Sequence, residues 1–231
     1  MGTDNYDIRR ALKALYTAPT DDFVAVDVPP MQYLAVDGHG DPNTSEAYQD
    51  AVEALYSVAY TVKFDSKKTL NRDFVVGPLE GTWRADDMAA FTARKKSDWD
   101  WTMMISQPEW ITGDAVDAAV KKTAAKKKLP ALPLLRRAEL TEGQSVQILH
   151  IGSYDDEGPT LARLHDEYLP SHGLVPSADH HEINLSDPRR TPPEKLKTIL
   201  RQPVAPRNAS TRLMSNSAAS GRYDGSVLSA K

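Results

Sequence analysis

Two separate stretches of the chain show the same succession of patterns. Residues 34–52 (LAVDGHGDPNTSEAYQDAV) and 149–168 (LHIGSYDDEGPTLARLHDEY) each run from an apolar strand pattern through an acidic, glycine-containing turn into an amphipathic helix. A further strand pattern follows each of them, at 75–81 (VVGPLEG) and 181–188 (HEINLSDP). We interpret this as a pseudo-repeat of strand–helix–strand–strand units. It predicts an α+β fold with one antiparallel sheet, helices on one face and a ligand cleft on the other.

The pseudo-repeat also predicts the domain organisation. Residues 1–206 are expected to form a single domain, with a first half at about 23–110, a connecting helix and loop at 111–140, and a second half at 141–206. Residues 207–231 are rich in serine and poor in large apolar side chains. We therefore expect this last segment to be a disordered tail.

Periodicity and turn residues predict the individual elements. Strands are expected at 23–28, 31–36, 74–76, 79–84, 99–106, 146–151 and 180–185. Helices are expected at 7–16, 45–64, 112–128 and 160–169, with a short helix or turn at 86–93. The motif TPPE at 191–194 has a capping residue, proline in the first turn and glutamate three residues on, which predicts another helix.

Composition excludes several classes of function. The chain of 231 residues has no cysteine, which rules out disulfides, cysteine-ligated metal centres and thiol nucleophiles. No HExxH, His-x-His, P-loop, GxGxxG or GxSxG motif is present, so we expect no metal and no cofactor. The formal net charge is −4, and the basic cluster between Lys121 and Arg137 fits the exposed, basic C-terminal end of a helix better than a nucleic-acid interface.

The hydropathy pattern indicates the cellular setting. No run approaches the roughly 18 apolar residues of a membrane helix, and the polar, acidic N-terminus does not resemble a signal peptide. We therefore expect a cytoplasmic protein without a membrane partner, present as a monomer or weak dimer.

Aromatic residues gather around the strand expected at 99–106. Alternation places Trp101 on one face of this strand and Met104 on the other. Core packing accounts for some of these side chains, but an aromatic wall with soft methionines also suits a flat, apolar or cationic ligand. The ligand-contact candidates are Trp83, Trp101, Tyr33, Tyr56, Tyr60, Met104, Glu80, His180 and Asn184.

Glu182 is the main candidate for catalysis. In HHEINL (180–185), alternation separates Glu182 from Ile183 and Leu185, which we expect to face the helices. Glu182 then points into the cleft, where burial raises the pKa of a carboxyl and prepares it to act as a general base or to attract a cation. The alternative is an exposed strand glutamate. Tyr154 follows the end of a strand. Its hydroxyl either donates a hydrogen bond to a substrate oxygen or orients a water, or the residue is a turn tyrosine that caps the core.

These residues lie in segments that resemble the GyrI-like small-molecule-binding domain proteins. The resemblance covers about residues 5–205 and is carried by the runs at 28–64, 74–84, 99–112, 146–174 and 180–204. It implies two strand–helix–strand–strand units around a cleft, as in the effector domains of drug-sensing transcription regulators, here resembling the stand-alone form. Members similar to this chain include hydrolases that open the cyclopropane ring of genotoxic DNA-alkylating natural products.

The resemblance implies roles for particular residues. Glu182 matches the key glutamate of the family, and the aromatic clamp maps to Trp83, Trp101 and nearby tyrosines. Two positions depart from the family pattern: Asn184 stands where an aromatic residue is frequent, and Arg84 ends LEGTWR where LEGLWW is common. If the missing aromatic residue normally takes part in catalysis, this chain binds such ligands without turning them over.

Three hypotheses follow from the sequence. The first is a hydrolase that adds water to the cyclopropane ring of alkylating natural products, in detoxification or self-resistance. The alternative is a non-catalytic binder or sequesterer of planar aromatic or cationic drugs. The third is a protein-interaction role such as gyrase modulation, for which no segment specifies a partner.

Overall fold

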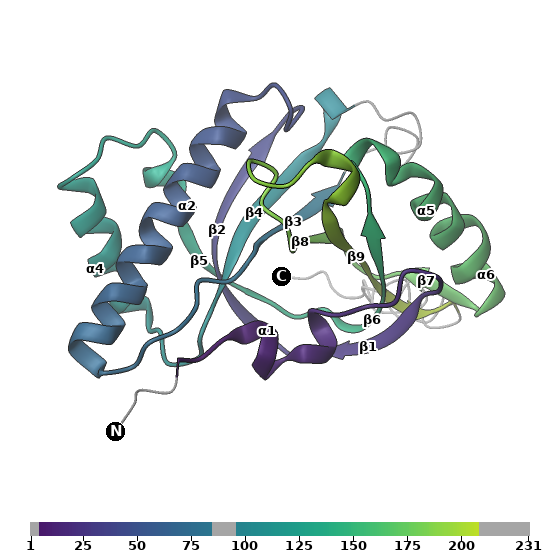
Figure 1. Ribbon diagram of the computed structural model, residues 1–231, viewed down its shortest axis with the longest axis horizontal. Coiled ribbons are helices and arrows are strands. Elements are labelled where there is room, and N and C mark those ends of the chain that lie inside the picture. The colour runs from purple at the N-terminus through teal and green to yellow at the C-terminus, as the bar shows by residue number, and fades with distance from the viewer. Residues whose placement is uncertain (1–4, 85–95, 208–231) are drawn as a thin grey trace, which may run out of the picture.

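The computed structural model describes residues 5–84 and 96–207 of the chain. The short helix or turn expected at 86–93, and all but the first residue of the tail expected at 207–231, lie outside the described residues. The described elements form one antiparallel sheet with helices packed on it (Figure 1).

The sheet joins strands from both parts of the chain. Its strand order is β1-β6-β9-β8-β3-β4-β2-β5, and β7 pairs with the end of β9. The strands are β1 (Val24–Val28), β2 (Met31–His39), β3 (Leu79–Arg84), β4 (Asp100–Gln107), β5 (Arg136–Leu140), β6 (Gly143–Ile151), β7 (Leu174–Pro176), β8 (His180–Asn184) and β9 (Lys197–Pro206). The central pair, β3 and β8, brings the two halves together, and the expected α+β class with an antiparallel sheet is confirmed.

Helices cover the two ends of one sheet face (Figure 1). The helices are α1 (Ile8–Ala11), α2 (Glu46–Asp65), α4 (Gly113–Ala124), α5 (Gly158–Ala162) and α6 (Leu169–Ser171), with one wide turn extending α2 at Ser66–Leu70 and another joining α5 to α6 at Arg163–Tyr168. Helix α2 packs on β2 and β4, whereas the α5–α6 segment packs on β6 and β9. No described helix is long and apolar enough to cross a membrane.

Helix α2 carries two different rows of side chains, one packed on the sheet and one rich in aromatic rings. Ser45 caps it by accepting a hydrogen bond from the Tyr48 backbone N–H at 3.3 Å. Its buried side consists of small and aliphatic side chains, which let the helix lie close to the sheet: Ala51, Ala54, Leu55, Val58, Ala59 and Val62. A second line of residues at a spacing of four runs from Tyr48 to Phe64. Because four residues advance the helix by one turn and about 40° more, this line winds gradually from the sheet toward solvent.

The opposite face of the sheet is covered by the N-terminal segment. Ile8 in α1, Leu15 and Tyr16 pack there with Tyr33 and Ile183. This face therefore belongs to the core and is not open to ligands.

The helix expected from 191 is wrong. Only one tight turn forms, at Pro193–Lys195, and the chain then enters strand β9. Residues 198–204 are all buried because β9 lies inside the sheet between β6 and β8. Its sequence, KTILRQPVAP, mixes apolar and polar residues without a clear alternation, so its pattern does not distinguish a strand buried on both faces from a helix. Strands β5 and β7 also form, within segments expected to be loops.

Candidate functional site

A cavity of about 1,280 Å³ opens on the helix-bearing face of the sheet. Helix α2 forms one wall, the α5 segment forms the other, and residues of β3 and β8 form the floor. The volume exceeds the upper end of the usual range for small-molecule pockets, about 1,000 Å³. The cavity therefore has room for a large ligand.

The cavity lies on the face that we had expected to be covered. The strand pairing Gly81 with Glu182 places Glu182 on the same face as the helices, and Ile183 points to the N-terminal segment instead. Alternation separated the two residues correctly but assigned them to the wrong faces. The helices leave the middle of their own face open, so the cleft and the helices share one side of the sheet.

Six of the predicted site residues line the cavity, and five do not. The lining includes Glu182, Tyr154, Trp83, Tyr56, His180 and Asn184. Tyr33, Met104 and Glu80 lie on the opposite face of the sheet, where they are fully or almost fully buried. Their position follows from the same reversal of faces, and it separates them from any ligand in the cavity.

Trp101 and Tyr60 lie on the cavity side but outside its lining. The Trp101 ring covers Gly38, where a Cβ atom would lie only 2.0 Å from it, and its Nε1–H donates to the Gly40 carbonyl at 3.2 Å. Tyr48 packs edge-on against Trp101 with ring centroids 5.4 Å apart, which places Trp101 in the core beneath α2. Tyr60 is one turn beyond Tyr56 and is 48% exposed.

Glu182 is held in a poorly solvated position on the cavity floor. Its side chain is 13% exposed, and its Oε1 lies 3.9 Å from Nε2 of His180. Burial raises the pKa of Glu182 to about 7, and the nearby Trp83 indole and the positive charges of His181 and Lys96 limit the rise. A carboxyl with this pKa exchanges protons near neutral pH, as a general acid or base requires.

His180 is a neutral polar group in the same floor. Burial, together with the positive charges of His165 and His181, lowers the pKa of His180 to about 3. Neither of its ring nitrogens has a hydrogen-bond partner of standard geometry among the described residues. A buried imidazole without partners is ready to donate one hydrogen bond to a ligand and accept another.

Two tyrosines complete the polar part of the cavity. Burial, with the negative charges of Glu157 and Glu182, raises the pKa of Tyr154 to about 12. The pKa of Tyr48 is also raised, chiefly by burial and then by Tyr154 and Glu182. Both phenols therefore stay protonated at neutral pH and can donate hydrogen bonds to a ligand oxygen.

Tyr48 and Trp99 are lining residues that the sequence reasoning did not assign. The stripe of Val52, Tyr56 and Tyr60 is spaced by four residues, and extending it backward by one step would have found Tyr48. Trp99 meets Trp83 edge-to-face, with ring centroids 5.7 Å apart. Together they form an aromatic wall.

A buried charge network lies directly beneath this floor, on the opposite face. His181 contacts Glu142 at 3.0 Å and Glu80 at 3.1 Å, and Arg201 contacts Glu142 at 3.0 Å. Tyr16 donates to Glu80 at 2.9 Å. Burial alone would lower the pKa of His181, but the two carboxylates raise it to about 9, so this imidazole is charged at neutral pH.

The described residues contain no group of three histidine, aspartate or glutamate side chains placed to hold a metal ion. Around Glu182 the cavity combines an aromatic wall, a carboxyl with a pKa of about 7 and neutral hydrogen-bond donors, and charged side chains such as Lys96 and Arg189 also line it. This combination suits a flat organic ligand with a polar edge.

Comparisons with known proteins agree with this architecture. A Listeria innocua protein described as an uncharacterized conserved protein is 37% identical, with a TM-score of 0.79 over 87% of this chain and all of its own. Two structures described as hydrolases from Listeria innocua are 37% and 38% identical over the same shares, with TM-scores of 0.73 and 0.74. A comparison with curated proteins gives no match.

The family comparison matches almost all of the described sheet. The model of the GyrI-like small-molecule-binding domain matches residues 22–205, a range that includes strands β1 to β8 and all of β9 except its last residue. With this match and the cavity on its helical face, the chain belongs to the GyrI-like small-molecule-binding domain family.

Proposed function

We propose that the protein is a hydrolase that opens an electrophilic cyclopropane ring fused to a dienone, by addition of water. The observation that carries the proposal is Glu182, a carboxyl with a pKa of about 7 on the floor of an aromatic cavity. The hydrolase descriptions of the two Listeria innocua relatives support a hydrolytic reaction.

The cavity supports binding of a flat, fused-ring substrate. Trp83 and Trp99 form a wall from the sheet side, and Tyr56 of α2 also lines the cavity. Aromatic walls of this kind bury the faces of a planar ligand and exclude bulk water from it. The polar edge of the substrate then lies near the tyrosine hydroxyls.

The reaction needs a base and a hydrogen-bond donor. Glu182 takes a proton from water while the water oxygen forms a bond to a cyclopropane carbon. The C–C bond of the ring breaks, and its electron pair moves into the dienone, which becomes a phenolate. Tyr154 donates a hydrogen bond to that oxygen, which finally takes up a proton, so the net change is one added water.

The test is Glu182→Gln, which keeps the size of the side chain but removes the base. We expect turnover of an activated cyclopropane substrate to fall by about 10²- to 10⁴-fold while binding is retained. Mass spectrometry of the ligand measures the gain of one water, and quenching of tryptophan fluorescence measures binding. Glu167→Gln is the matched control, because Glu167 is exposed and lies outside the cavity lining.

Two outcomes would contradict the proposal. Normal turnover by Glu182→Gln would show that Glu182 is not the general base. Quenching of tryptophan fluorescence by a ligand that is recovered with unchanged mass would instead support the alternative, a non-catalytic binder of planar or cationic drugs.

A further inference from the structure

Helix α2 carries a row of aromatic rings that continues beyond the cavity. We call Tyr56, Tyr60 and Phe64 the aromatic ladder. Successive ring centroids lie 6.4 and 6.3 Å apart, and each pair of rings is inclined by 28°. Tyr60 is 48% exposed and Phe64 is 59% exposed. Large rings exposed in a row on one helix face are costly unless something covers them.

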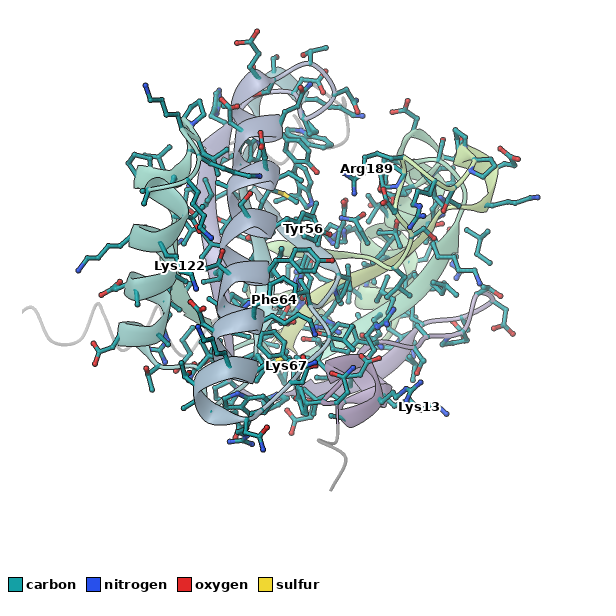
Figure 2. The ribbon with its side chains drawn as sticks, turned by 60° about the vertical axis from the view of Figure 1, so that its left-hand side comes forward. Lys13, Tyr56, Phe64, Lys67, Lys122 and Arg189 are labelled. Atoms are coloured by element: carbon teal, nitrogen blue, oxygen red, sulfur yellow. The ribbon has the colours of Figure 1, made fainter. Side chains whose placement is uncertain are left out.

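The ladder starts at the cavity and leads away from it. Tyr56 belongs to the cavity lining, whereas Tyr60 and Phe64 follow it at one-turn intervals toward solvent. In Figure 2, Tyr56 and Phe64 lie along the same side of α2, with Arg189 across the opening from them. A ligand that fills the cavity and protrudes from it on this side would therefore pass over the ladder.

The opposite side of this opening carries a flat, paired cation. Arg189 lines the cavity and contacts Asp187 through two side-chain hydrogen bonds of 3.0 Å. Asp187 is the main cause of the raised pKa of Arg189, and Tyr56 and Tyr60 contribute less to it. A guanidinium plane stacks on aromatic rings, and the pairing with Asp187 offsets the charge of Arg189 itself.

We propose that the aromatic ladder is a distal binding subsite for an elongated, uncharged ligand made of several linked aromatic rings. The first ring system of that ligand occupies the cavity above Glu182, and the following rings lie along Tyr60 and Phe64. The inference rests on the proposed placement of a flat ligand in the cavity but does not require that the ligand be turned over. Stacking tolerates different ring systems, so the subsite selects for ligand length and flatness more than for particular substituents.

The experiment compares two planar ligands that carry no cyclopropane. The short ligand is 2-phenylbenzimidazole, and the long one is a phenyl-bis-benzimidazole. Isothermal calorimetry gives Kd for both with the wild-type protein, Tyr60→Ala and Phe64→Ala. The control is Leu70→Ala, because Leu70 is 51% exposed but lies outside the ladder.

We expect the wild type to bind the long ligand more tightly than the short one. Each ladder variant should raise Kd for the long ligand by about three- to tenfold more than for the short ligand, as loss of one stacking contact predicts. Tyr60→Phe should restore tight binding of the long ligand, because it restores the ring without the hydroxyl.

Two results would overturn the subsite. One is equal affinity of the wild type for both ligands, and the other is an effect of Tyr60→Ala and Phe64→Ala no larger than that of Leu70→Ala. If Phe64→Ala changes the sedimentation of the protein and leaves Kd for the long ligand unaltered, the ladder is a contact between copies of the chain instead. None of these readouts depends on turnover, so failure of the proposed hydrolysis would be recognised separately.

Discussion

The buried network beneath the cavity allows a quantitative prediction for Glu142→Gln. Glu142 contacts both His181 and Arg201 at 3.0 Å, and its side chain is 2% exposed. Burial alone would raise the pKa of Glu142, but these two cations outweigh it and lower the pKa to about 2. Glutamine keeps the shape of the side chain and removes the charge that the two cations share.

The magnitude follows from the change in pKa. At about 1.4 kcal/mol per pH unit, a pKa lowered from 4.5 to about 2 contributes about 3 kcal/mol to the free energy of unfolding. Breaking one partner of a buried ion pair independently predicts about 3–5 kcal/mol. The raised pKa of His181 reports the same interaction from the other side, so the two contributions are not added.

The sign of the pH dependence differs between the two partners. The pKa of Glu142 is lowered by folding, so its contribution is present above pH 4.5 and is lost as the pH falls through about 2. The pKa of His181 is raised by folding, so its contribution is present below pH 6.5 and is lost as the pH rises through about 9. The effect of Glu142→Gln should therefore be largest between pH 4.5 and 6.5.

Urea unfolding followed by tryptophan fluorescence measures this effect. We expect the wild type to exceed Glu142→Gln by about 3 kcal/mol near pH ~5.5, and by less near pH ~9.5. Glu139→Gln is the matched control, because Glu139 is exposed on the neighbouring strand β5 and should change stability by less than about 0.5 kcal/mol. Equal losses in both variants, or a loss that does not vary with pH, would refute the reasoning.

Two further predictions concern Glu182. If its carboxylate is the base, the rate of hydrolysis should be half-maximal near pH 7 and fall about tenfold per pH unit below that, as a pH–rate profile would show; a flat profile between pH ~5 and ~8 would exclude it. Folding raises the pKa of Glu182 from 4.5 to about 7, so ionisation of this carboxyl lowers the free energy of unfolding as the pH rises through that range. Glu182→Gln should therefore stabilise the protein by up to about 3 kcal/mol at pH ~8 in the same urea assay. Unchanged or lower stability of this variant would contradict the buried placement of Glu182.

Much of the fold could be predicted because its elements are strongly patterned. Alternation predicted β3 and β8 within one residue of their observed bounds, and the apolar period with its Ser45 cap predicted α2 equally well. The strand β5 was missed because its sequence, RRAEL, belongs to an edge strand and is mostly polar. Local pattern contains little information about such a strand, which is held by pairing with β2 rather than by a hydrophobic face.

The site was harder to predict than the elements that carry it. Alternation states which residues share a face, but it does not state which face the helices leave open. That ambiguity moved Tyr33, Met104 and Glu80 away from the ligand cavity while Glu182 and His180 remained in it. It was resolved only by long-range packing, because the N-terminal segment covers the face on which the sequence had predicted the cleft.

Strand β8 connects the two buried environments through neighbouring residues. His181 points into the charge network, and Glu182 points into the cavity, so one peptide unit separates an imidazole that is charged at neutral pH from a carboxyl with a pKa of about 7. The charge of His181 opposes the effect of burial on Glu182 and keeps the pKa of that carboxyl near 7 rather than higher. Since Glu80 and Glu142 keep His181 protonated, the network on the closed face of the sheet helps to set the proton affinity of the open face.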